Sequence, residues 1–502
     1  MTVAAAPERR RFAWPVPWQA LVVAGVMLAI LVATSGAYGF HRDEMYFIVA
    51  GRHPAFGYAD QPPLTPLLSA VSAALLGVSP MAVRVLPELE MALVVVLTAW
   101  IARDLGATRR AQTLAAVTAA LSGYLGVGHL DDTAELDLLA WAVILWLLVK
   151  LLGGGDRRLW LVLGLATGIG LENKDTLPFL GAGLAVGLLV TRRWDLLRSR
   201  WVWAGLVIAV LLWLPNLIWQ FENGFPQLAL ASHISGNAGD NRAQFITLIW
   251  LFSGPLLFPV ALAGAIWVLH AREAAPYRTI GIGAVVAFGL VFVTGGKGYY
   301  AVGTLPVFMA AGAMTLDRWL GRGRLSVRAV KSVSFVAAAA ISGALVAYLL
   351  LPILPLADYA KSTLPATVPD TAEEIGWPQL VSQVERVVAA LPPDQRARAV
   401  ILTGNYGEAG ALELMGSGLP PVYSGHNAFW NWGPPPPDRT VVVRVGDWTP
   451  AEWTPYFTGC RTVATIDNGL GIANQEQGQA ISVCTGLHAP WASIWPQLRH
   501  LD

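Results

Sequence analysis

The chain has 502 residues, of which 55% are hydrophobic and only 13% are charged, against roughly 25% charged residues in ordinary soluble domains. Its 34 Lys and Arg residues almost balance its 33 Asp and Glu residues, which excludes the basic excess that a nucleic-acid partner requires. The mean hydropathy of +0.52 also excludes a disordered chain and argues against a water-soluble multidomain enzyme.

The hydrophobic residues fall in long apolar runs that end near residue 352. A helix needs about 20 apolar residues to cross a bilayer, so these runs predict a polytopic α-helical membrane protein with about eleven spans. The expected spans are 17–38, 83–102, 111–128, 136–152, 159–172, 176–191, 202–220, 244–269, 279–294, 300–316 and 332–352. The first run follows three arginines, as a signal peptide does, but no small-residue cleavage site follows it, so we interpret it as a membrane helix.

Positive charge is concentrated in alternate loops, and this bias sets the expected orientation. With the N-terminus in the cytoplasm, the arginines at 9–11 and most other basic loop residues lie inside, while the opposite loops carry mainly carboxylates. Eleven spans then leave the C-terminal segment outside. We therefore expect a multi-pass protein of the cytoplasmic membrane, with a membrane domain over 1–356, a first external loop at 39–82, and an extracytoplasmic α/β domain over 357–502.

The C-terminal segment combines one helical stretch with short β-rich runs that Gly- and Pro-rich turns separate. The expected helix is 377–391, and the expected strands are 399–403, 440–445, 461–466 and 480–483. The only two cysteines of the chain, Cys460 and Cys484, lie in this segment. On the external side a disulfide between them is expected, and the alternative is a pair of unrelated buried thiols.

Ionisable residues at the ends of membrane helices are candidate functional residues, because charges near membrane depth are energetically expensive. The densest group follows the first span, where Asp43 and Glu44 are adjacent. Successive helical residues diverge by about 100°, so one carboxylate can face a cavity while the other is tied to an arginine or a backbone amide. A carboxylate that faces a cavity suits a general base, and the alternative is an ordinary solvated helix end.

A second acidic cluster, at 129–137, lies at the external end of the third and fourth spans. Asp137 directly precedes an apolar run, which places it on the membrane helix and makes it the stronger candidate for a site. We interpret Asp131 and Asp132 as solvated loop residues or helix caps.

Two lysines stand out on the acidic external side. Lys174 either contributes to a site or pairs with neighbouring carboxylates, an interaction that contributes little when it is exposed. Lys297 is flanked by glycines that let backbone amides approach an anion, and lysine binds phosphate as a compact charge. The adjacent Tyr299 and Tyr300 are either ligand contacts or members of an interfacial aromatic belt.

Several familiar motifs are absent from the sequence, among them the P-loop, His-Glu-x-x-His and Cys-x-x-Cys. The histidines are scattered, and nothing in their spacing demands a metal. An external site without nucleotide motifs points to a substrate delivered from the bilayer.

The external segments resemble those of glycosyltransferase family 39, which belongs to the GT-C superfamily and includes protein O-mannosyltransferase-like and lipid A aminoarabinose transferase-like membrane enzymes. The first similar motifs are Asp-Glu-Met-Tyr-Phe at 43–47 and Gly-Tyr-Ala-Asp-Gln-Pro-Pro-Leu at 57–64. Further similar segments are 128–141, 173–174, 215–226 and 297–306, together with 404–411 and 424–434, which look like those of actinobacterial members. The resemblance covers nearly the whole chain.

This resemblance implies an inverting transfer of a sugar from a polyprenyl-phosphate donor to an acceptor hydroxyl. Asp43 matches the catalytic base, and Glu44 would orient neighbouring groups or the acceptor. Lys297, with Tyr299 or Tyr300, matches the segment near the donor phosphate and would stabilise the leaving phosphate. The other residues expected to contact substrate here are Asp60, Gln61, Asp137 and Lys174. A lipid monophosphate leaving group does not itself require a divalent ion, so we expect no metal or other cofactor.

Several alternatives stay open. The acceptor is a lipid, a polysaccharide or a protein, and the sugar is not identified. In the C-terminal segment, His426 and Trp430 either contact the acceptor or belong to a rigid aromatic turn. Asp131 and Asp132 make their segment more acidic than the family pattern, which leaves a specialised acceptor or a metal contact open.

A different class of function is a lipid or sugar transporter or flippase of the cell envelope. Transporters often carry internal repeats and ionisable groups near the bilayer midplane. Here the ionisable residues lie at helix ends and no repeat is visible, so the sequence favours the transferase. A non-catalytic envelope scaffold is the third interpretation.

Overall fold

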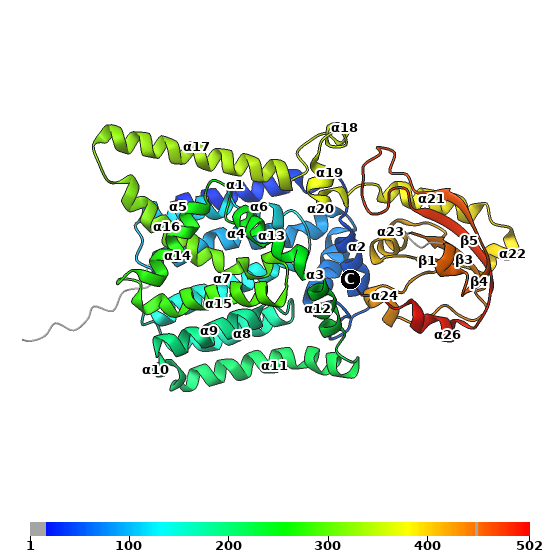
Figure 1. Ribbon diagram of the computed structural model, residues 1–502, viewed down its shortest axis with the longest axis horizontal. Coiled ribbons are helices and arrows are strands. Elements are labelled where there is room, and N and C mark those ends of the chain that lie inside the picture. Colours follow the sequence, from blue (N-terminus) through cyan, green and yellow to red (C-terminus); the bar gives the residue numbers. More distant parts are fainter. Residues whose placement is uncertain (1–16, 447–449, 502) are drawn as a thin grey trace, which may run out of the picture.

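A computed structural model describes residues 17–446 and 450–501, so the arginines at 9–11 lie outside the described residues. Helices make up the described chain as far as residue 397, and a small β-sheet follows (Figure 1). The helices of the first part are α1 (Trp18–Thr34), α2 (Arg42–Arg52), α3 (Leu64–Leu76), α4 (Pro80–Asp104), α5 (Arg109–Ala120), α6 (Tyr124–Val127), α7 (Ala134–Leu152), α8 (Leu159–Leu171), α9 (Leu177–Thr191), α10 (Trp194–Leu197), α11 (Arg200–Glu222), α12 (Pro226–Gly236), α13 (Ala238–Phe252), α14 (Phe258–His270), η1 (Ala275–Tyr277), α15 (Arg278–Thr294), η2 (Gly298–Thr304), α16 (Leu305–Leu320) and α17 (Leu325–Leu350).

Each expected span contains a helix, but the span expected at 111–128 is divided into α5 and α6, and the span expected at 244–269 is also wrong as a single helix. It divides into α13 and α14 because Gly254 adopts a positive φ of 80° and Pro255 has no backbone N–H to continue the helix. By length and composition, five helical stretches of the described residues are able to cross a membrane: Pro80–Asp104, Arg200–Glu222, Ala275–Thr294, Gly298–Leu320 and Leu325–Leu350. The apolar helices α1, α3, α8, α9 and α14 are shorter.

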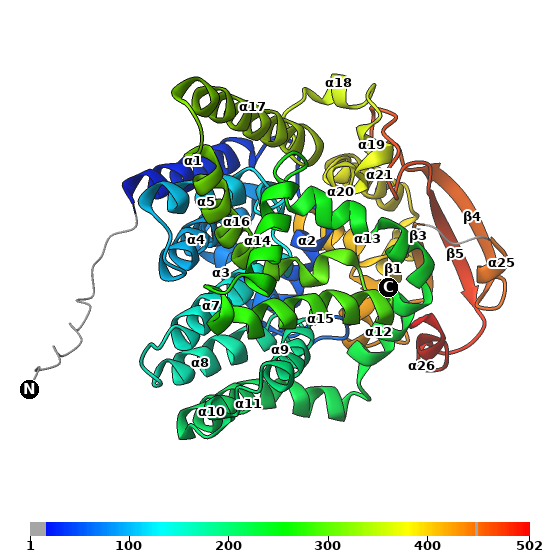
Figure 2. The ribbon, with the colours of Figure 1, turned by 60° about the vertical axis from the view of Figure 1, so that its left-hand side comes forward.

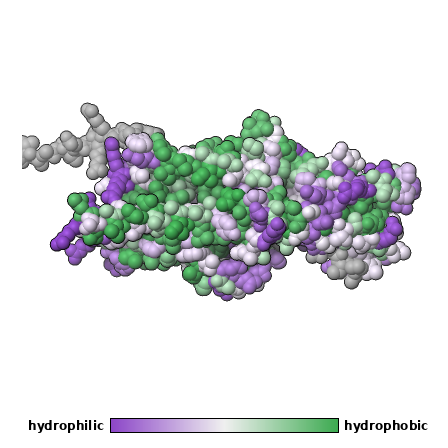
Figure 3. Space-filling view, turned by 90° about the horizontal axis from the view of Figure 1, so that it is seen from above, coloured by the Kyte–Doolittle hydropathy of each residue, from purple (hydrophilic) through white to green (hydrophobic). Residues whose placement is uncertain are grey.

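Two of the long apolar helices, α11 and α17, lie on opposite flanks of the bundle in both ribbon views (Figures 1 and 2). Their apolar side chains are exposed, among them Leu211, Val333 and Val336, which are each at least 60% accessible. Hydrophobic side chains likewise cover much of the surface of the helical part, while polar side chains gather at its ends (Figure 3). Such a surface suits lipid as the surrounding medium.

The interior of the helical bundle is packed through small residues. A Cβ added to Gly264 of α14 would lie 1.8 Å from the Phe308 carbonyl oxygen of α16, and one added to Gly312 would lie 1.9 Å from the Val260 carbonyl oxygen. Neither position has room for a side chain, so the two backbones touch directly. Close backbone approach of this kind is the usual means of helix association in membranes.

The C-terminal segment forms a five-stranded mixed sheet in the order β2-β1-β3-β5-β4, with β1 parallel to β2 and β3, and β5 antiparallel to β3 and β4. Four strands overlap the expected runs, with β1 matching its run to the residue, and the short β2 is additional. The elements of this segment are α18 (Leu356–Tyr359), α19 (Leu364–Thr367), α20 (Pro369–Ala372), α21 (Trp377–Ala389), α22 (Pro393–Ala397), β1 (Ala399–Thr403), α23 (Tyr406–Met415), β2 (Val422–Ser424), α24 (Asn427–Asn431), β3 (Val441–Val445), α25 (Pro450–Trp453), β4 (Phe457–Thr465), β5 (Ala480–Leu487), α26 (Trp491–Ile494) and η3 (Trp495–Leu498).

The two cysteines form the expected disulfide. Cys460 of β4 and Cys484 of β5 are directly paired in the antiparallel ladder, with their Cα atoms 4.1 Å apart. The bond therefore ties the edge strand to its neighbour.

A hydrophobic core joins this sheet to the first loop of the membrane domain. Met45 and Ile48 of α2 belong to the same buried cluster as Trp377 of α21, Ile401 of β1 and Ala411 of α23. In the view of Figure 1, α2 lies between the helical bundle and the sheet. The segment 39–82 is thus held between the two parts of the chain, and its polar residues lie at that junction.

Candidate active site

The adjacent carboxylates Asp43 and Glu44 lie in the first turn of α2, which a capping box begins. His41 is the N-cap, and its backbone N–H donates to Glu44 Oε2 at 2.7 Å. This arrangement satisfies an otherwise unpaired amide and points Glu44 inward. The Glu44 side chain is fully buried, whereas the Asp43 side chain keeps 23% of its surface accessible. The two carboxylates therefore have different environments, as their helical spacing predicts.

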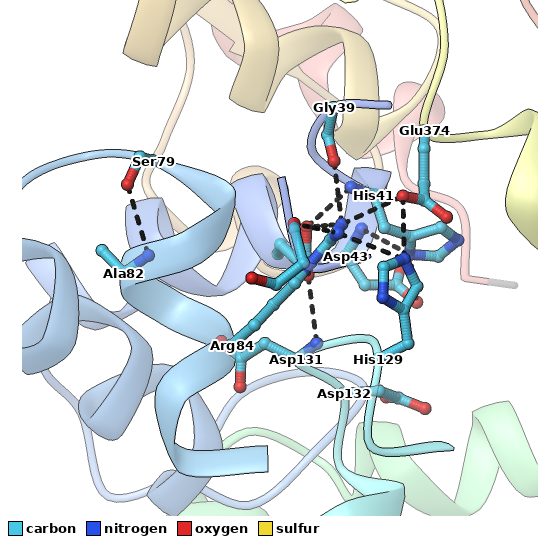
Figure 4. A network of polar contacts seen from close by, with 12 residues as sticks. Gly39, His41, Asp43, Ser79, Ala82, Arg84, His129, Asp131, Asp132 and Glu374 are labelled. Carbon is cyan, nitrogen blue, oxygen red and sulfur yellow. Dashed lines mark hydrogen bonds and ion pairs between the residues drawn. The ribbon is translucent and has the colours of Figure 1, made fainter. Parts of the chain in front are cut away.

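Glu44 belongs to a buried network of charges centred on Arg84 of α4. Figure 4 shows Arg84 together with Glu374 and His129. Arg84 Nε lies 2.6 Å from Glu44 Oε1, and Arg84 Nη2 lies 3.2 Å from Glu374 Oε2. His129 Nε2 is 3.3 Å from the same Glu374 oxygen. The guanidinium also donates to the carbonyl oxygens of Ser35 and Gly39, at 2.6 and 2.8 Å.

This network connects four separate segments of the chain: the first turn of α2 with the residues before it, α4, the loop before α7 and the segment before α21. Each of its charged side chains is at most 1% accessible. Burial opposes ionisation of Glu374, but the charges of Arg84 and His129 hold the pKa of this carboxyl below its usual value. The Glu44 side chain is fully buried, and its oxygens contact Arg84 and the backbone amides of His41 and Asp131.

Asp43 is held in its ionised form by groups from both parts of the chain. Tyr406 of α23 donates its hydroxyl to Asp43 Oδ1 at 2.7 Å. His41 Nδ1 lies 3.6 Å from Oδ2, and Arg42 Nε lies 3.9 Å from Oδ1. Burial would raise the pKa of Asp43, but the charges of His41 and Arg42, the Tyr406 hydroxyl and the charge of Lys297 together lower it. An ionised, partly accessible carboxylate is able to accept a proton.

A second carboxylate, Asp60, lies near Asp43, but its pKa is shifted in the opposite direction. Tyr46 donates its hydroxyl to Asp60 Oδ1 at 2.6 Å, and the Asn427 amide donates to Oδ2 at 3.3 Å. Burial, together with the negative charge of Asp43, raises the pKa of Asp60 to about 7. The rings of Tyr46 and Tyr406 are 4.8 Å apart, so the two tyrosines form a bridge between the two acids.

The C-terminal segment supplies part of this site. Its helix α23 packs directly on α2: a Cβ added to Gly407 would lie 2.7 Å from Arg42 Cβ, and one added to Gly410 would lie 3.1 Å from Met45 Cβ. Tyr406 begins this helix and Asn427 begins α24. Sequence reasoning missed both residues as site residues. The available signal was the small-residue spacing in Gly-Asn-Tyr-Gly-Glu-Ala-Gly at 404–410, which marks a helix that approaches another closely.

Lys174 lies beside Tyr299 and Tyr300, the two tyrosines expected near the donor phosphate. Lys174 Nζ lies 5.3 Å from the centre of the Tyr299 ring and 5.6 Å from that of Tyr300. Burial acts to lower the pKa of Lys174, but Asp132, Tyr300 and the acids of α7 raise it. Lys174 is therefore positively charged, and the groups that stabilise its charge lie outside its own sequence neighbourhood.

Lys297 and Asp137 are placed differently. Lys297 is the N-cap of η2, and its side chain is exposed. Its charge lowers the pKa of Asp43, so the two groups share one electrostatic environment. Asp137 is buried, and its Oδ1 accepts from the Thr176 hydroxyl at 2.6 Å and from the Trp141 indole at 3.2 Å. These bonds link α7 to the loop that precedes α9.

The interpretation of Asp131 as a solvated loop residue is wrong. Its side chain is buried and accepts from the Ser69 hydroxyl of α3, and its backbone N–H donates to Glu44 Oε1 at 3.1 Å. Burial raises the pKa of Asp131 well above its usual value. Asp132 Oδ1 accepts from the adjacent Thr133 amide at 2.6 Å, but it does not cap α7, whose N-cap is Thr133. Gln61 is buried beside Asp60, and its amide nitrogen has no partner among the described residues.

The two candidate residues of the C-terminal segment, His426 and Trp430, have different surroundings. Trp430 and Trp495 exchange indole-to-carbonyl hydrogen bonds of 2.9 and 3.0 Å, so Trp430 belongs to a rigid aromatic turn of this segment. His426 is buried, with its ring 4.8 Å from that of Tyr406. His426 thus lies behind the tyrosine that binds Asp43. Among the residues that the structure describes, no three His, Cys, Asp or Glu side chains form a metal-binding group.

Known proteins resemble this chain in sequence over one segment and in fold over most of its length. Residues 60–219 match the family described as dolichyl-phosphate-mannose-protein mannosyltransferase. A search of curated proteins by sequence found no match. Among solved structures, the chain is similar to ArnT from Cupriavidus metallidurans bound to undecaprenyl phosphate, with a TM-score of 0.58, 15% identity, and coverage of 94% of this chain and 98% of that one.

Two further structures show the same likeness. The apo state of the same ArnT has a TM-score of 0.58 at 14% identity and covers 92% of this chain and 97% of that one. The arabinofuranosyltransferase AftD from Mycobacteria has a TM-score of 0.50 at 15% identity, with 94% of this chain and 42% of that one covered. Residues 60–219 therefore resemble the dolichyl-phosphate-mannose-protein mannosyltransferase family, and the chain shares its fold with ArnT over most of its length.

Proposed function

We propose that the protein transfers a sugar from a polyprenyl-phosphate donor to an acceptor hydroxyl at the outer face of the cytoplasmic membrane, with Asp43 as the general base. The observation that carries this proposal is the state of Asp43: ionised, partly accessible, and positioned by Tyr406 at 2.7 Å. The undecaprenyl phosphate named for ArnT supports a lipid-phosphate carrier as the donor.

The proposed chemistry is a single displacement. The acceptor hydroxyl transfers its proton to the Asp43 carboxylate as its oxygen attacks the anomeric carbon. The bond from that carbon to the phosphate oxygen breaks, and the polyprenyl phosphate leaves with the electron pair. Attack opposite the leaving group inverts the anomeric centre.

Negative charge develops on the leaving phosphate, so a nearby cation stabilises the transition state. Lys297 is exposed and acts electrostatically on Asp43, which suits it to this role. Lys174, with Tyr299 and Tyr300, supplies a second cationic group in the same part of the membrane domain. The proposal assigns Glu44 to the positioning of α2 through Arg84 rather than to substrate contact.

The proposed organisation is a membrane domain over 1–356 with about eleven spans and a cytoplasmic N-terminus, followed by an extracytoplasmic domain over 357–502. The disulfide between Cys460 and Cys484 supports an oxidising compartment for the second domain. The fit of α23 against α2 supports a catalytic site assembled from both domains.

The test separates transfer from transport. Purified protein in vesicles is given polyprenyl-phosphate sugars with different headgroups, and both sugar transfer and lipid scrambling are measured. Cells with and without the protein are compared for lipid-linked sugars and envelope glycans, which identifies the sugar and the acceptor class. Transfer from one donor, with accumulation of that donor in cells lacking the protein, supports the proposal. Scrambling or uptake with no transfer would favour a flippase or transporter instead.

A further inference from the structure

A cavity of about 470 Å³ lies beside Asp60, where the first loop, the end of α11 and α24 meet. Its volume falls within the range of small-molecule sites, which is roughly 300–1,000 Å³. The side chains that give it chemical character are Arg52, His53, Trp219, Asn223, Asn431 and Trp432. None of these residues has a role in the proposed proton transfer.

The aromatic walls of the cavity are fixed by packing. The Trp432 ring stacks on His53, with centroids 4.3 Å apart and planes 20° from parallel, and Phe429 packs edge-on against Trp432 at 4.5 Å. On the other side, a Cβ added to Gly57 would lie 2.8 Å from the Trp219 ring, so the loop backbone rests directly on that indole. The cavity thus presents preformed flat apolar surfaces.

Polar groups stand at the edge of these surfaces. The Arg52 and Asn431 side chains are both exposed, and the charge of Arg52 acts on Glu413 of α23. The Asn223 amide nitrogen donates to the Trp219 carbonyl at 2.9 Å, which fixes the direction of its side chain. Amides and a guanidinium around aromatic faces match the chemistry of a sugar, whose C–H faces pack on rings while its hydroxyls exchange hydrogen bonds.

The cavity is connected to the acids of the candidate active site. Tyr58 and Ala59 of its wall precede Asp60 directly, and Ala428 of its wall donates its N–H to the Tyr46 hydroxyl at 3.2 Å. The same hydroxyl donates to Asp60 at 2.6 Å. A molecule held in the cavity therefore lies next to the Asp60 end of the tyrosine bridge, and Asp43 lies at the other end.

The charges distinguish this cavity from the region suited to the donor phosphate. Arg52 is the single cation among its lining residues, whereas Lys174 and Lys297 belong to other loops. An uncharged, hydroxyl-rich ligand fits this lining better than a phosphate does. We propose that the cavity is a saccharide subsite that holds a sugar unit of a glycan acceptor. The assignment to an acceptor rests on the proposed function.

Direct binding of saccharides tests the proposal without requiring transfer. Purified full-length protein in nanodiscs is titrated with methyl glycosides of common hexoses and pentoses and with their disaccharides, and binding is followed by saturation-transfer NMR. Variants Trp432→Ala and Asn431→Ala are compared with Trp194→Ala, an exposed tryptophan of α10 that serves as the matched control. The exposed Asn431 keeps the test valid if Trp432→Ala fails to fold.

We expect at least one saccharide to bind, with about tenfold weaker binding in each cavity variant, since loss of a ring contact or of a hydrogen bond is worth about 1.4 kcal/mol. The Trp194→Ala variant should bind as the wild type does. Absence of binding to every saccharide, or binding that both cavity variants retain, would overturn the subsite. So would occupation of the cavity by polyprenyl phosphate alone. Saccharide binding in a protein whose Asp43→Asn variant still transfers sugar would instead refute the proposed base and leave the subsite intact.

Discussion

The hydrogen bond from Tyr406 to Asp43 offers a quantitative test of how the two parts of the chain cooperate. Tyr406→Phe removes the hydroxyl that donates to Asp43 Oδ1 at 2.7 Å, while the ring that packs 4.8 Å from Tyr46 remains. A hydrogen bond to a charged group contributes about 1.5–3 kcal/mol. Because one pKa unit corresponds to about 1.36 kcal/mol, the pKa of Asp43 should rise by about 1–2 units.

The sign of this change fixes the expected pH profile. The hydroxyl stabilises the ionised carboxylate, so its loss favours the protonated form, which is unable to act as a base. The acid limb of kcat/KM should therefore move to higher pH by about 1–2 units, while activity on the alkaline plateau changes little. Sugar transfer in vesicles, measured from about pH 4 to about pH 8, gives this profile.

Tyr423→Phe is the matched control, since Tyr423 lies in the same segment and packs against Trp495, away from Asp43. An acid limb that stays in place in Tyr406→Phe, or an equal loss of activity at every pH, would refute the reasoning. The second result would mean that Tyr406 supports the fold of the site and not the ionisation of Asp43.

Three further changes test other parts of the account. Arg84→Met removes the guanidinium that pairs with the buried Glu44 and Glu374 carboxylates, and breaking such a pair costs about 3–5 kcal/mol, so thermal unfolding should shift strongly downward; an unchanged midpoint would contradict the network. Lys297→Ala should lower kcat by about 100-fold with little change in thermal stability. Lys361→Ala, at an exposed lysine, should change neither kcat nor thermal stability. Equal kcat values in the two variants would remove Lys297 from the mechanism. Asp60→Asn tests how stability depends on pH. The pKa of Asp60 is about 7 in the folded protein, which lies above its unfolded value, so ionisation of Asp60 disfavours the folded state. The stability of the wild type should therefore fall as pH rises from about 4 to about 7. That decline should flatten in Asp60→Asn, and an identical slope in both proteins would exclude Asp60 as its source.

Much of the architecture could be predicted from the sequence because apolar runs and turn residues are local features. The strand at 399–403 was predicted to the residue, and Cys460 and Cys484 form the predicted disulfide. The apolar run at 244–269 led to a wrong span because hydropathy does not report the backbone break at Gly254 and Pro255. The short strand β2 was missed because three residues leave almost no pattern.

The site was only partly predictable, because its geometry depends on contacts between distant segments. Adjacency in sequence was enough to separate the roles of Asp43 and Glu44, since helical geometry turns neighbours apart. It was not enough to find Tyr406, which lies 363 residues away and reaches Asp43 only because α23 packs on α2. Asp131 was misjudged for the same reason: its burial depends on Ser69 of α3 and on Glu44, and no local pattern reports either contact.

The central claim is that Asp43 is the base that activates the acceptor, and its direct test is the transfer rate of Asp43→Asn. Asparagine keeps the size of the side chain but is unable to take up a proton. With a polyprenyl-phosphate sugar that the wild type uses, we expect kcat to fall by about 10²- to 10⁴-fold. Asp358→Asn, an exposed aspartate of α18, should retain the wild-type rate. Transfer by Asp43→Asn at the wild-type rate would contradict the account.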